Sequence, residues 1–327
     1  MFLSVERYDH KQKNTWDDFV RRSKNGTFLL LRNYMDYHQD RFQDHSLLIR
    51  DMQGRVRALL PANQNDCCLS SHGGLTYGGF ISDTAMTTPE MLEIFKKSLS
   101  YMQENYFKRF IYKTIPSIYH KAPAEEDRYA LFLCDARLYR RDVLTVVDKN
   151  CRLSFQNRRR RGIARAKKND LYIKLYDDFA LYWDILTENL QKRHQVKPVH
   201  SLVEIQILHD YFPENIKLFC CCRGSAVLAG VVIYESEKVA HAQYISADEK
   251  GRELGALDLL FDYLLNDYYI EKGIFDFGNS NEENGYKLNK GLIEQKEGFG
   301  GRTVVHDYYE IGLARGEVEH RLMGAML

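Results

Sequence analysis

The sequence lacks long hydrophobic runs, a surplus of charge of either sign, and the cysteine spacings that are typical of disulfide or zinc frameworks. None of its segments approaches the roughly 20 apolar residues that a membrane-spanning helix needs. Charges at Glu6, Arg7, Asp9 and Lys11 interrupt the start of the chain, where a signal peptide would carry an apolar stretch. We therefore expect a cytoplasmic protein with no transmembrane segment.

The near-zero net charge and the cysteines exclude further classes. A formal net charge of +1 gives no overall electrostatic reason to expect a membrane or nucleic-acid partner, and DNA is not expected. The seven cysteines are odd in number, and several are adjacent, as in Cys220, Cys221 and Cys222. Adjacent residues on a strand point to opposite faces, so we expect reduced, buried cysteines and no metal site.

What is present is a composition typical of a folded protein, with 44% hydrophobic and 28% charged residues over a length of 327. In the first half we predict a hairpin at residues 46–60 and a helix over 88–102 that starts at a Thr-Pro pair. A strand is predicted at 110–112, and further strands at 130–134 and 139–147.

The second half repeats this order of elements. We predict three antiparallel strands between residues 216 and 246, a helix over 252–269, and a strand at 274–277. A polar segment then leads to a final strand at 303–311. The common order indicates two similar domains derived from a duplication.

The predicted fold class is therefore α/β (α+β), with two tandem domains that each contain a mixed, mainly antiparallel sheet flanked by helices. We expect the first domain at residues 1–150 and the second at 151–313. A C-terminal tail follows at 314–327.

A polar, glycine-rich stretch at residues 275–302 separates the last two predicted strands. Glycine has no Cβ and tolerates positive φ, so such a stretch lets the backbone approach a ligand closely. A long polar connection on the surface is the alternative interpretation.

The strand and helix order of the second half resembles that of the GNAT superfamily of N-acetyltransferases. Residues 252–257 are similar to the donor loop of that family: Arg252 and Gly255 are kept, whereas Leu257 stands where Gly or Ala is usual. The resemblance implies that Arg252, Gly255 and Ala256 bind the pyrophosphate of acyl-CoA or acetyl-CoA as a co-substrate, with no tightly bound cofactor. The alternative is an ordinary helix start.

Two such domains in tandem, with Lys296 followed by Gly298-Phe299-Gly300 near the end, resemble the Fem family of peptidoglycan peptidyltransferases. This resemblance implies that Lys296 helps to stabilise the tetrahedral intermediate of acyl transfer. A fixed cation at an oxyanion is worth roughly 3 kcal/mol. A solvated lysine is the alternative.

Carboxylates in the same stretch are candidate general bases, because an acceptor amine must lose a proton. Asp276 and Glu282 are the catalytic candidates, although capping of a short helix by Ser280 or Asn281 explains the same pattern. Candidate substrate-binding residues come from several segments: Tyr244, Asn279, Asn281, Asn289, His72, Tyr77, Arg158 and Arg159.

Each of these substrate-binding candidates has a structural alternative. Of His241 and Tyr244, at most one points into a cleft, and the other packs in the core. His72 and Tyr77 line an interdomain cleft or form a bulge. The basic run at Arg158 and Arg159 holds a phosphate-bearing substrate, a membrane surface or an RNA, or it is a solvated helix.

We predict an acyltransferase that moves an acyl group from acyl-CoA to an amine of a sugar, amino acid or lipid precursor of the cell envelope. One alternative is Fem-like aminoacyl transfer from a charged tRNA, which the lack of a long helical arm disfavours. Another is a non-catalytic binding protein with the same fold.

Overall fold

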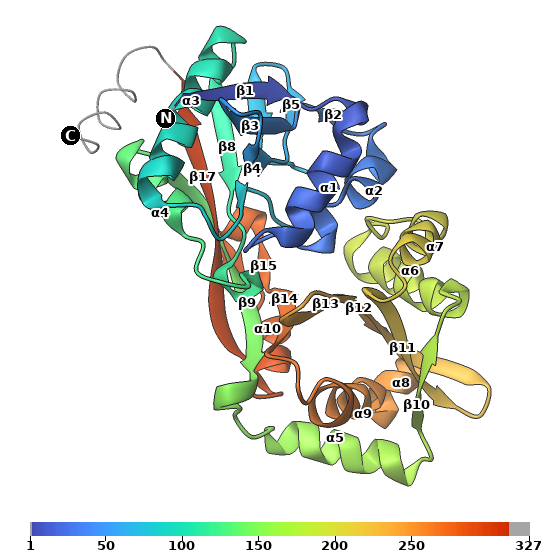
Figure 1. Ribbon diagram of the computed structural model, residues 1–327. Helices are drawn as coiled ribbons and strands as arrows, with labels where there is room; N and C mark the ends of the chain where they lie inside the picture. The colour runs from blue at the N-terminus through green and yellow to red at the C-terminus, as the bar shows by residue number, and fades with distance from the viewer. Residues whose placement is uncertain (1, 314–327) are drawn as a thin grey trace. The chain divides into compact units, whose positions relative to one another are not determined.

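The chain folds into two compact units, each of which contains a β-sheet (Figure 1). The computed structural model describes residues 2–313, apart from the side chains of residues 193 and 194. The second unit is Asp142–Val305, and the first unit contains the chain up to Arg141 and resumes at His306. The expected tail at 314–327 lies outside the described residues.

Two long strands carry the chain between the units. β9 (Arg137–Asp148) begins in the first unit and ends in the second, and β17 (Arg302–Gly312) returns to the first. The units therefore divide within these strands, whereas the boundary predicted from the sequence lies at 150/151, with residues 303–313 in the second domain. Each strand is continuous where the chain passes from one unit to the other, so the sequence has no loop-like composition there that would mark a boundary.

The first unit contains two sheets. The strands of the smaller one are antiparallel and lie in the order β1 (Leu3–Arg7), β3 (Leu47–Asp51), β4 (Val56–Leu60) and β7 (Ile81–Ser82). The end of β17 continues into strands in the order β8 (Arg109–Lys113), β6 (Cys68–Ser70), β5 (Asn63–Asn65) and β2 (Gln43–Asp44). β3 and β4 are the predicted hairpin, with Gly54 at positive φ in its turn.

The helices of the first unit pack on these sheets. They are α1 (Lys13–Arg22), α2 (Arg32–Met35), α3 (Thr88–Glu104) and α4 (Glu126–Leu133), with 3₁₀ turns at His10–Gln12, Phe28–Leu30, Asp36–His38 and Ser117–Tyr119. The prediction of a strand at 130–134 is wrong, because these residues form the end of α4 and its cap. Ala130 and Leu131 are buried whereas Phe132 is exposed. An apolar run this short does not show whether its hydrophobic residues repeat with the period of a helix or of a strand.

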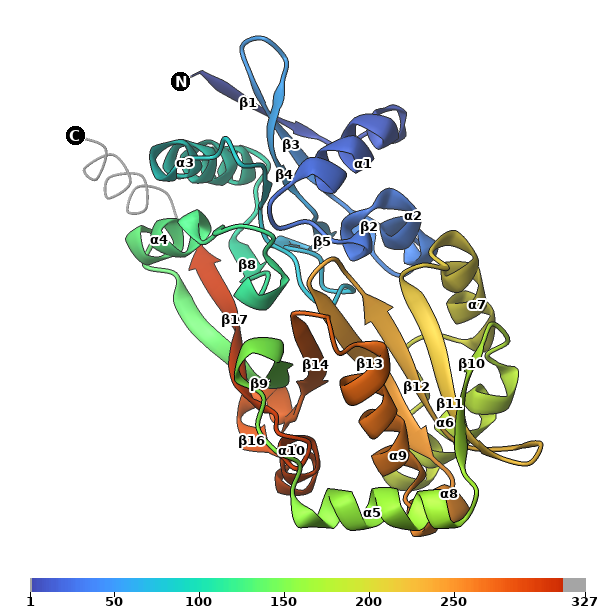
Figure 2. The ribbon, with the colours of Figure 1, turned by 60° about the horizontal axis from the view of Figure 1, so that its bottom comes forward.

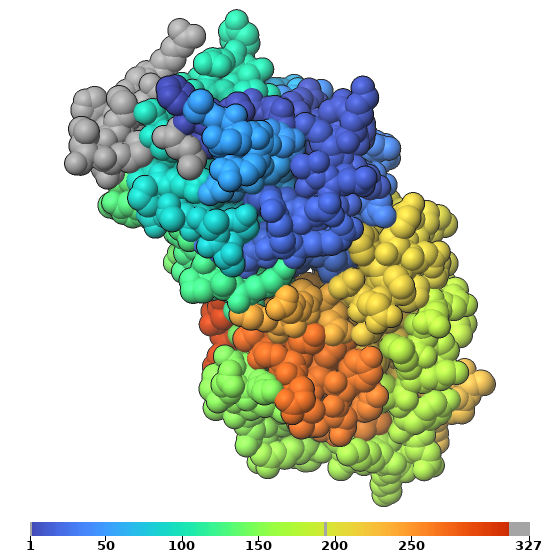
Figure 3. Space-filling view, in the orientation of Figure 1, coloured from blue at the N-terminus to red at the C-terminus, as the bar shows by residue number. Residues whose placement is uncertain are grey.

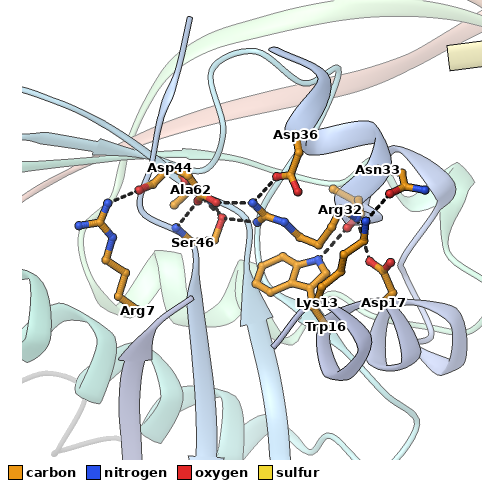
Figure 4. A network of polar contacts seen from close by, with 11 residues as sticks. Arg7, Lys13, Trp16, Asp17, Arg32, Asn33, Asp36, Asp44, Ser46 and Ala62 are labelled. Carbon is orange, nitrogen blue, oxygen red and sulfur yellow. Dashed lines mark hydrogen bonds and ion pairs between the residues drawn. The ribbon is translucent and has the colours of Figure 1, made fainter. Parts of the chain in front are cut away.

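Arg32 is the centre of a polar network in the first unit, and its side chain is only 1% exposed (Figure 4). Its guanidinium contacts the carboxylates of Asp36 and Asp44. It also lies 3.8 Å from the ring centroid of Tyr8 and 5.3 Å from that of Trp16. This single cation therefore holds α1, α2 and β2 together.

The second unit is built on a sheet with one parallel pair. Its strands lie in the order β10 (Tyr172–Tyr176), β11 (Ile216–Arg223), β12 (Ala226–Glu235), β13 (Val239–Ala247), β14 (Ile274–Asn279) and β9. Only the contact of β13 with β14 is parallel among these pairs. A small hairpin follows: β15 (Asn281–Glu282) and β16 (Lys287–Leu288).

Helices cover both faces of this sheet (Figure 2). They are α5 (Asn157–Lys168), α6 (Ala180–His194), α7 (Leu202–Tyr211), α8 (Glu249–Leu254), α9 (Ala256–Tyr263) and α10 (Lys290–Glu297), with a π-helical turn at Leu264–Tyr268 and 3₁₀ turns at Lys149–Cys151 and Glu283–Gly285. α9 packs on the face that presents Val231, and Tyr182 of α6 packs on the opposite face at Gly230. The single helix predicted at 252–269 is broken at Gly255, whose φ is +80°.

The mixed, mainly antiparallel α/β class predicted from the sequence is confirmed in both units. Among the described residues, no helix combines the length and the apolar character that crossing a lipid bilayer requires.

Replacement of Arg32 by Met should lower the free energy of unfolding of the first unit by about 2–3 kcal/mol, because two carboxylates that are one-quarter exposed lose their partner. Burial raises the pKa of Asp44, but Arg32 outweighs this effect and leaves the pKa below 3.8. The difference from the unsubstituted protein should therefore shrink as the pH falls below 3.8.

Urea unfolding followed by tryptophan fluorescence measures this effect. The chain has two tryptophans, so a Trp183→Phe background leaves Trp16 as the reporter of the first unit. Arg50→Met is the matched control, since the ion pair of Arg50 with Glu6 is more exposed and should contribute less than about 1 kcal/mol. Equal losses in the two variants would contradict the prediction.

Candidate functional site

β13 and β14 pair only over their first three residues and then diverge. The pairs are Val239 with Ile274, Ala240 with Phe275, and His241 with Asp276. Beyond this point β13 continues against β12 as far as Ala247, while β14 pairs through Asn279 with β9. A gap therefore opens between two neighbouring strands in the middle of the sheet.

A cavity of about 270 Å³ occupies this gap. Its lining comes from helices on both faces of the sheet, as expected for an opening that passes between two strands. The lining residues are Leu186, Asn189, Leu190, Ile245, Ser246, Ala247, Arg252, Leu257, Phe261, Phe277, Leu292, Gln295, Lys296 and Phe299. The wall is thus mostly apolar, with a few polar groups, as in many small-molecule sites.

Lys296 of α10 is the buried cation of this wall, with 4% of its surface exposed. Its ammonium donates hydrogen bonds to the carbonyl oxygens of Gly278, at 3.0 Å, and of Asn279. An ammonium has three N–H bonds, so one remains for the cavity. Burial lowers the pKa of Lys296 to about 8, and the negative charge of Asp276 opposes part of this shift.

Gly278 connects the polar groups at the point of divergence. Its φ of +72° is a conformation that other residues rarely adopt. Its N–H donates to Oδ1 of Asp276 at 2.7 Å, and its carbonyl accepts from Lys296. A Cβ at this position would lie 3.1 Å from Cε1 of His241. One glycine therefore brings Asp276, Lys296 and His241 together.

Asp276 and His241 form a hydrogen-bonded pair across the two strands, with 2.9 Å between Nδ1 of His241 and Oδ2 of Asp276. Asp276 is 1% exposed, and the side chain of His241 is 12% exposed. The predicted catalytic residues Asp276 and Lys296 thus lie close together, both bonded to Gly278.

Glu282, the third catalytic candidate, lies on the β15–β16 hairpin with its side chain 41% exposed. Its carboxylate accepts a hydrogen bond from Asn289 at 2.8 Å and lies 3.3 Å from Nζ of Lys287. It does not line the cavity between β13 and β14.

The three asparagines predicted to bind substrate make hydrogen bonds within the loop. Asn289 caps α10, because its Oδ1 accepts from the N–H of Leu292. Asn281 accepts from the N–H of Val143, and Asn279 donates to Asp142 at 3.5 Å. These bonds tie the loop to β9 and to α10, and none of the three side chains lines the cavity.

The predicted donor loop, residues 252–257, packs closely against α5. Ala256 and Gly255 are buried, and a Cβ at Gly255 would lie 2.5 Å from the carbonyl oxygen of Gly162 in α5. The carboxylate of Asp248 already caps α8 by accepting from the N–H of Gly251. Gly255 and Ala256 are therefore packed against α5, and the N–H of Gly251 already has a partner; the binding of acyl-CoA at this loop stays a prediction.

Arg252 is the member of this loop that reaches the cavity. Its guanidinium donates to the carbonyl oxygen of Ala247 and to the side chain of Asn189. A polar hollow beside it carries four carboxylates against three cations, from Glu188, Asn189, Lys192, Asp248, Glu249, Lys250, Arg252 and Glu253. The hollow therefore has no excess of positive charge.

Three other predicted residues are buried by packing. The hydroxyl of Tyr244 bonds to Nδ1 of His200, and its ring packs edge-on against Trp183. In the first unit, the hydroxyl of Tyr77 bonds to that of Thr27 at 2.7 Å. His72 is 3% exposed, and burial lowers its pKa to about 3.

The basic run forms α5 on the surface of the second unit (Figure 3). Arg159 faces inward, pairs with Asp258, and lies 5.2 Å from the ring centroid of Phe299. Arg158 faces outward. The other exposed cations of the helix are Arg160, Arg161, Arg165, Lys167 and Lys168.

Three further polar residues line the cavity, Asn189, Ser246 and Gln295, and no sequence pattern predicted a role for them. Asn189 donates to the hydroxyl of Ser246 at 2.8 Å across 57 residues of sequence. A contact between residues so far apart in the sequence produces no local pattern from which it could be predicted. Three consecutive residues at the end of β13, Ile245, Ser246 and Ala247, line the cavity, so the alternation of a strand could not have identified Ser246.

Comparisons with known proteins agree with this geometry. Residues 150–288 match the family model of the acetyltransferase (GNAT) domain. A search of the curated proteins gave no match.

Three solved structures share the fold over nearly the whole chain. FemX is 11% identical to this chain, and the alignment covers 98% of this chain and 99% of the FemX chain with a TM-score of 0.66. L-PGS from Bacillus licheniformis is 13% identical, with 98% and 97% covered and a TM-score of 0.60. The tandem GNAT protein from the clavulanic acid biosynthesis pathway is 10% identical, with 96% and 100% covered and a TM-score of 0.50.

These likenesses confirm the predicted arrangement of two tandem GNAT-like domains. The chain therefore has a Fem-like tandem GNAT fold, and its residues 150–288 match the model of the acetyltransferase (GNAT) domain.

Proposed function

We propose that the second unit transfers an acyl group to an amine at the cavity between β13 and β14. The observation that carries this proposal is the buried ammonium of Lys296 at the cavity wall, with two N–H bonds held by carbonyls and the third available. The acceptor that we propose is an amine of a sugar, amino acid or lipid precursor of the cell envelope.

The chemistry follows from this arrangement. The amine nitrogen attacks the acyl carbonyl carbon, and the carbonyl oxygen becomes an oxyanion. A cation that is already fixed in a mostly apolar cavity stabilises this charge without reorganisation. Binding of the two reactants in one cavity supplies proximity, so that no covalent intermediate with the protein is needed.

Two donors fit the apolar cavity, and they differ in how their anionic part is bound. An acyl-CoA would place its thioester arm in the gap, but the residues that would bind its pyrophosphate, Gly255 and Ala256, are packed against α5. An aminoacyl-tRNA is the second candidate. It needs no pyrophosphate loop, and its phosphates would bind an external basic surface.

α5 supplies such a surface and favours the second candidate. The helix contains no acidic residue, and its guanidinium groups suit phosphate oxygens. Arg158, Arg160, Arg161 and Arg165 are exposed, whereas Arg159 and Asp258 fasten the helix to α9. The charges on α5 are therefore directed outward from a firmly packed helix.

Lys296→Met should lower kcat about 10²-fold, which corresponds to the loss of one oxyanion donor. Turnover by the unsubstituted protein should fall as the pH rises above about 8, because Lys296 then loses its proton. Product formation with a panel of acyl-CoA and aminoacyl-tRNA donors and amine acceptors, read by mass spectrometry, measures both effects.

Lys290→Met is the matched control for this experiment, because Lys290 is exposed at the start of the same helix. Its kcat should stay within twofold of the unsubstituted protein. A stability measurement gives a second readout. The folded pKa of about 8 lies below the ordinary 10.5, so the unfolded chain binds more protons between these values. Stability should therefore rise across this range in the unsubstituted protein and not in Lys296→Met.

The two donors are distinguished by replacing Arg158, Arg160, Arg161 and Arg165 with Gln. If the donor is a charged tRNA, this variant should bind tRNA at least tenfold more weakly at low salt, and the dependence of binding on salt should flatten. Binding is measured by filter retention over a salt series, beside thermal-shift titrations with acetyl-CoA.

A control variant with the same charge change replaces four scattered, exposed lysines with Gln: Lys11, Lys108, Lys238 and Lys290. Its affinity for tRNA should change less than threefold. Stabilisation by acetyl-CoA together with equal tRNA affinity in both variants would reject the tRNA donor and favour acyl-CoA.

A further inference from the structure

His241 and Asp276 are the last paired residues before β13 and β14 diverge. Directly paired residues of neighbouring strands present their side chains on the same face of the sheet. The two side chains therefore meet at the edge of the gap, with Nδ1 of His241 2.9 Å from Oδ2 of Asp276. They come from positions 35 residues apart in the sequence.

The bonds of Asp276 define the state of the imidazole. Oδ1 of Asp276 accepts from the N–H of Gly278, and Oδ2 faces Nδ1 of His241. A carboxylate only accepts hydrogen bonds, so the proton of a neutral imidazole lies on Nδ1. The lone pair is then on Nε2, and among residues 2–313 no hydrogen bond to Nε2 of His241 is present.

The position of His241 relative to Lys296 is also defined by Gly278. The imidazole occupies the side of Gly278 where a Cβ would project, and the carbonyl oxygen of Gly278 accepts from the ammonium of Lys296. A proton acceptor and an oxyanion donor are thus both next to Gly278, although only Lys296 is among the residues that line the cavity. Glu282, in contrast, is partly exposed and ion-paired with Lys287.

We propose that His241 is the general base of the acyl transfer and that Asp276 is its positioning residue. This inference rests on the function proposed above. Asp276 is buried and holds two donors, so it acts through the imidazole and does not touch the acceptor.

The proton and bond changes balance without any further reactant. The new C–N bond forms as the amine attacks the acyl carbon, and the proton of the amine passes to Nε2 of His241. Collapse of the oxyanion breaks the bond from the acyl carbon to the sulfur or oxygen of the donor. The imidazolium then returns its proton to this leaving group, which departs as a thiol or an alcohol.

The test replaces His241 with Asn, whose amide keeps a donor for Asp276 but has no basic nitrogen. We expect kcat to fall about 10²- to 10⁴-fold with KM for the donor within threefold. In His241→Gly, added imidazole should restore part of the lost rate, which it cannot do for a residue that only packs. His209→Asn is the control, because His209 is a buried histidine of α7 bonded to the carbonyl of Ile216.

A readout that does not need turnover tests the role of Asp276. In protein labelled with ¹⁵N-histidine, the signals lost in His241→Asn identify His241, and they should show the tautomer protonated at Nδ1. Asp276→Asn should abolish this preference and should also lower kcat at least tenfold, because an amide accepts or donates and no longer selects one tautomer.

The possible outcomes distinguish failure of His241 as the base from failure of the proposed function. If the unsubstituted protein is active and His241→Asn keeps its rate within threefold, the base is another group and the proposed function stands. If the unsubstituted protein acylates no amine with any donor of the panel, the proposed function fails and the catalytic role of His241 fails with it. A loss in His241→Asn that imidazole restores in His241→Gly, with the Nδ1 tautomer present, establishes both.

Discussion

The divergence of β13 and β14 is the constraint on which the rest of the site depends. Two neighbouring strands that stop pairing inside a sheet leave backbone N–H and C=O groups without their strand partners, and such groups must be satisfied in another way. Here two ionisable side chains do so. Asp276 accepts the N–H of Gly278, and Lys296 donates to the carbonyls of Gly278 and Asn279. The buried charges are therefore a consequence of the opening that creates the cavity.

The structural and the chemical roles of these charges support each other. Burying an ammonium is unfavourable, which is why the pKa of Lys296 falls to about 8, and the nearby Asp276 offsets part of this cost. The same carbonyls that satisfy the ammonium also fix its direction, so its third N–H is oriented before any substrate binds. A lysine free in solvent would have to lose rotamer freedom first, at up to about 2 kcal/mol.

Local pattern predicted much of the fold and only part of the site. The hairpin at β3 and β4, the meander of β11 to β13 and the unusual polarity around Lys296 depend on nearby residues, and the sequence shows them. The end of α4 was misread because a five-residue apolar run is shorter than the periods that distinguish a helix from a strand. The pair of His241 with Asp276 depends on the register between strands that are far apart in the sequence. The asparagines around Gly278 give the same sequence pattern whether their side chains bind a ligand or the backbone.

The loop at Gly255 shows why a motif alone does not identify a donor. Its glycine is required here by a close approach of α5, since a Cβ would meet the backbone at Gly162, and α5 follows β9 far earlier in the chain. Helix packing thus explains the presence of Gly255, a residue that the motif associates with phosphate binding. In the same packing, the side chain of Arg159 points inward and pairs with Asp258, whereas the other arginines of α5 are exposed. A donor that inserts only its reactive end into a cavity of about 270 Å³, and binds by phosphates on the outer surface, is compatible with both features.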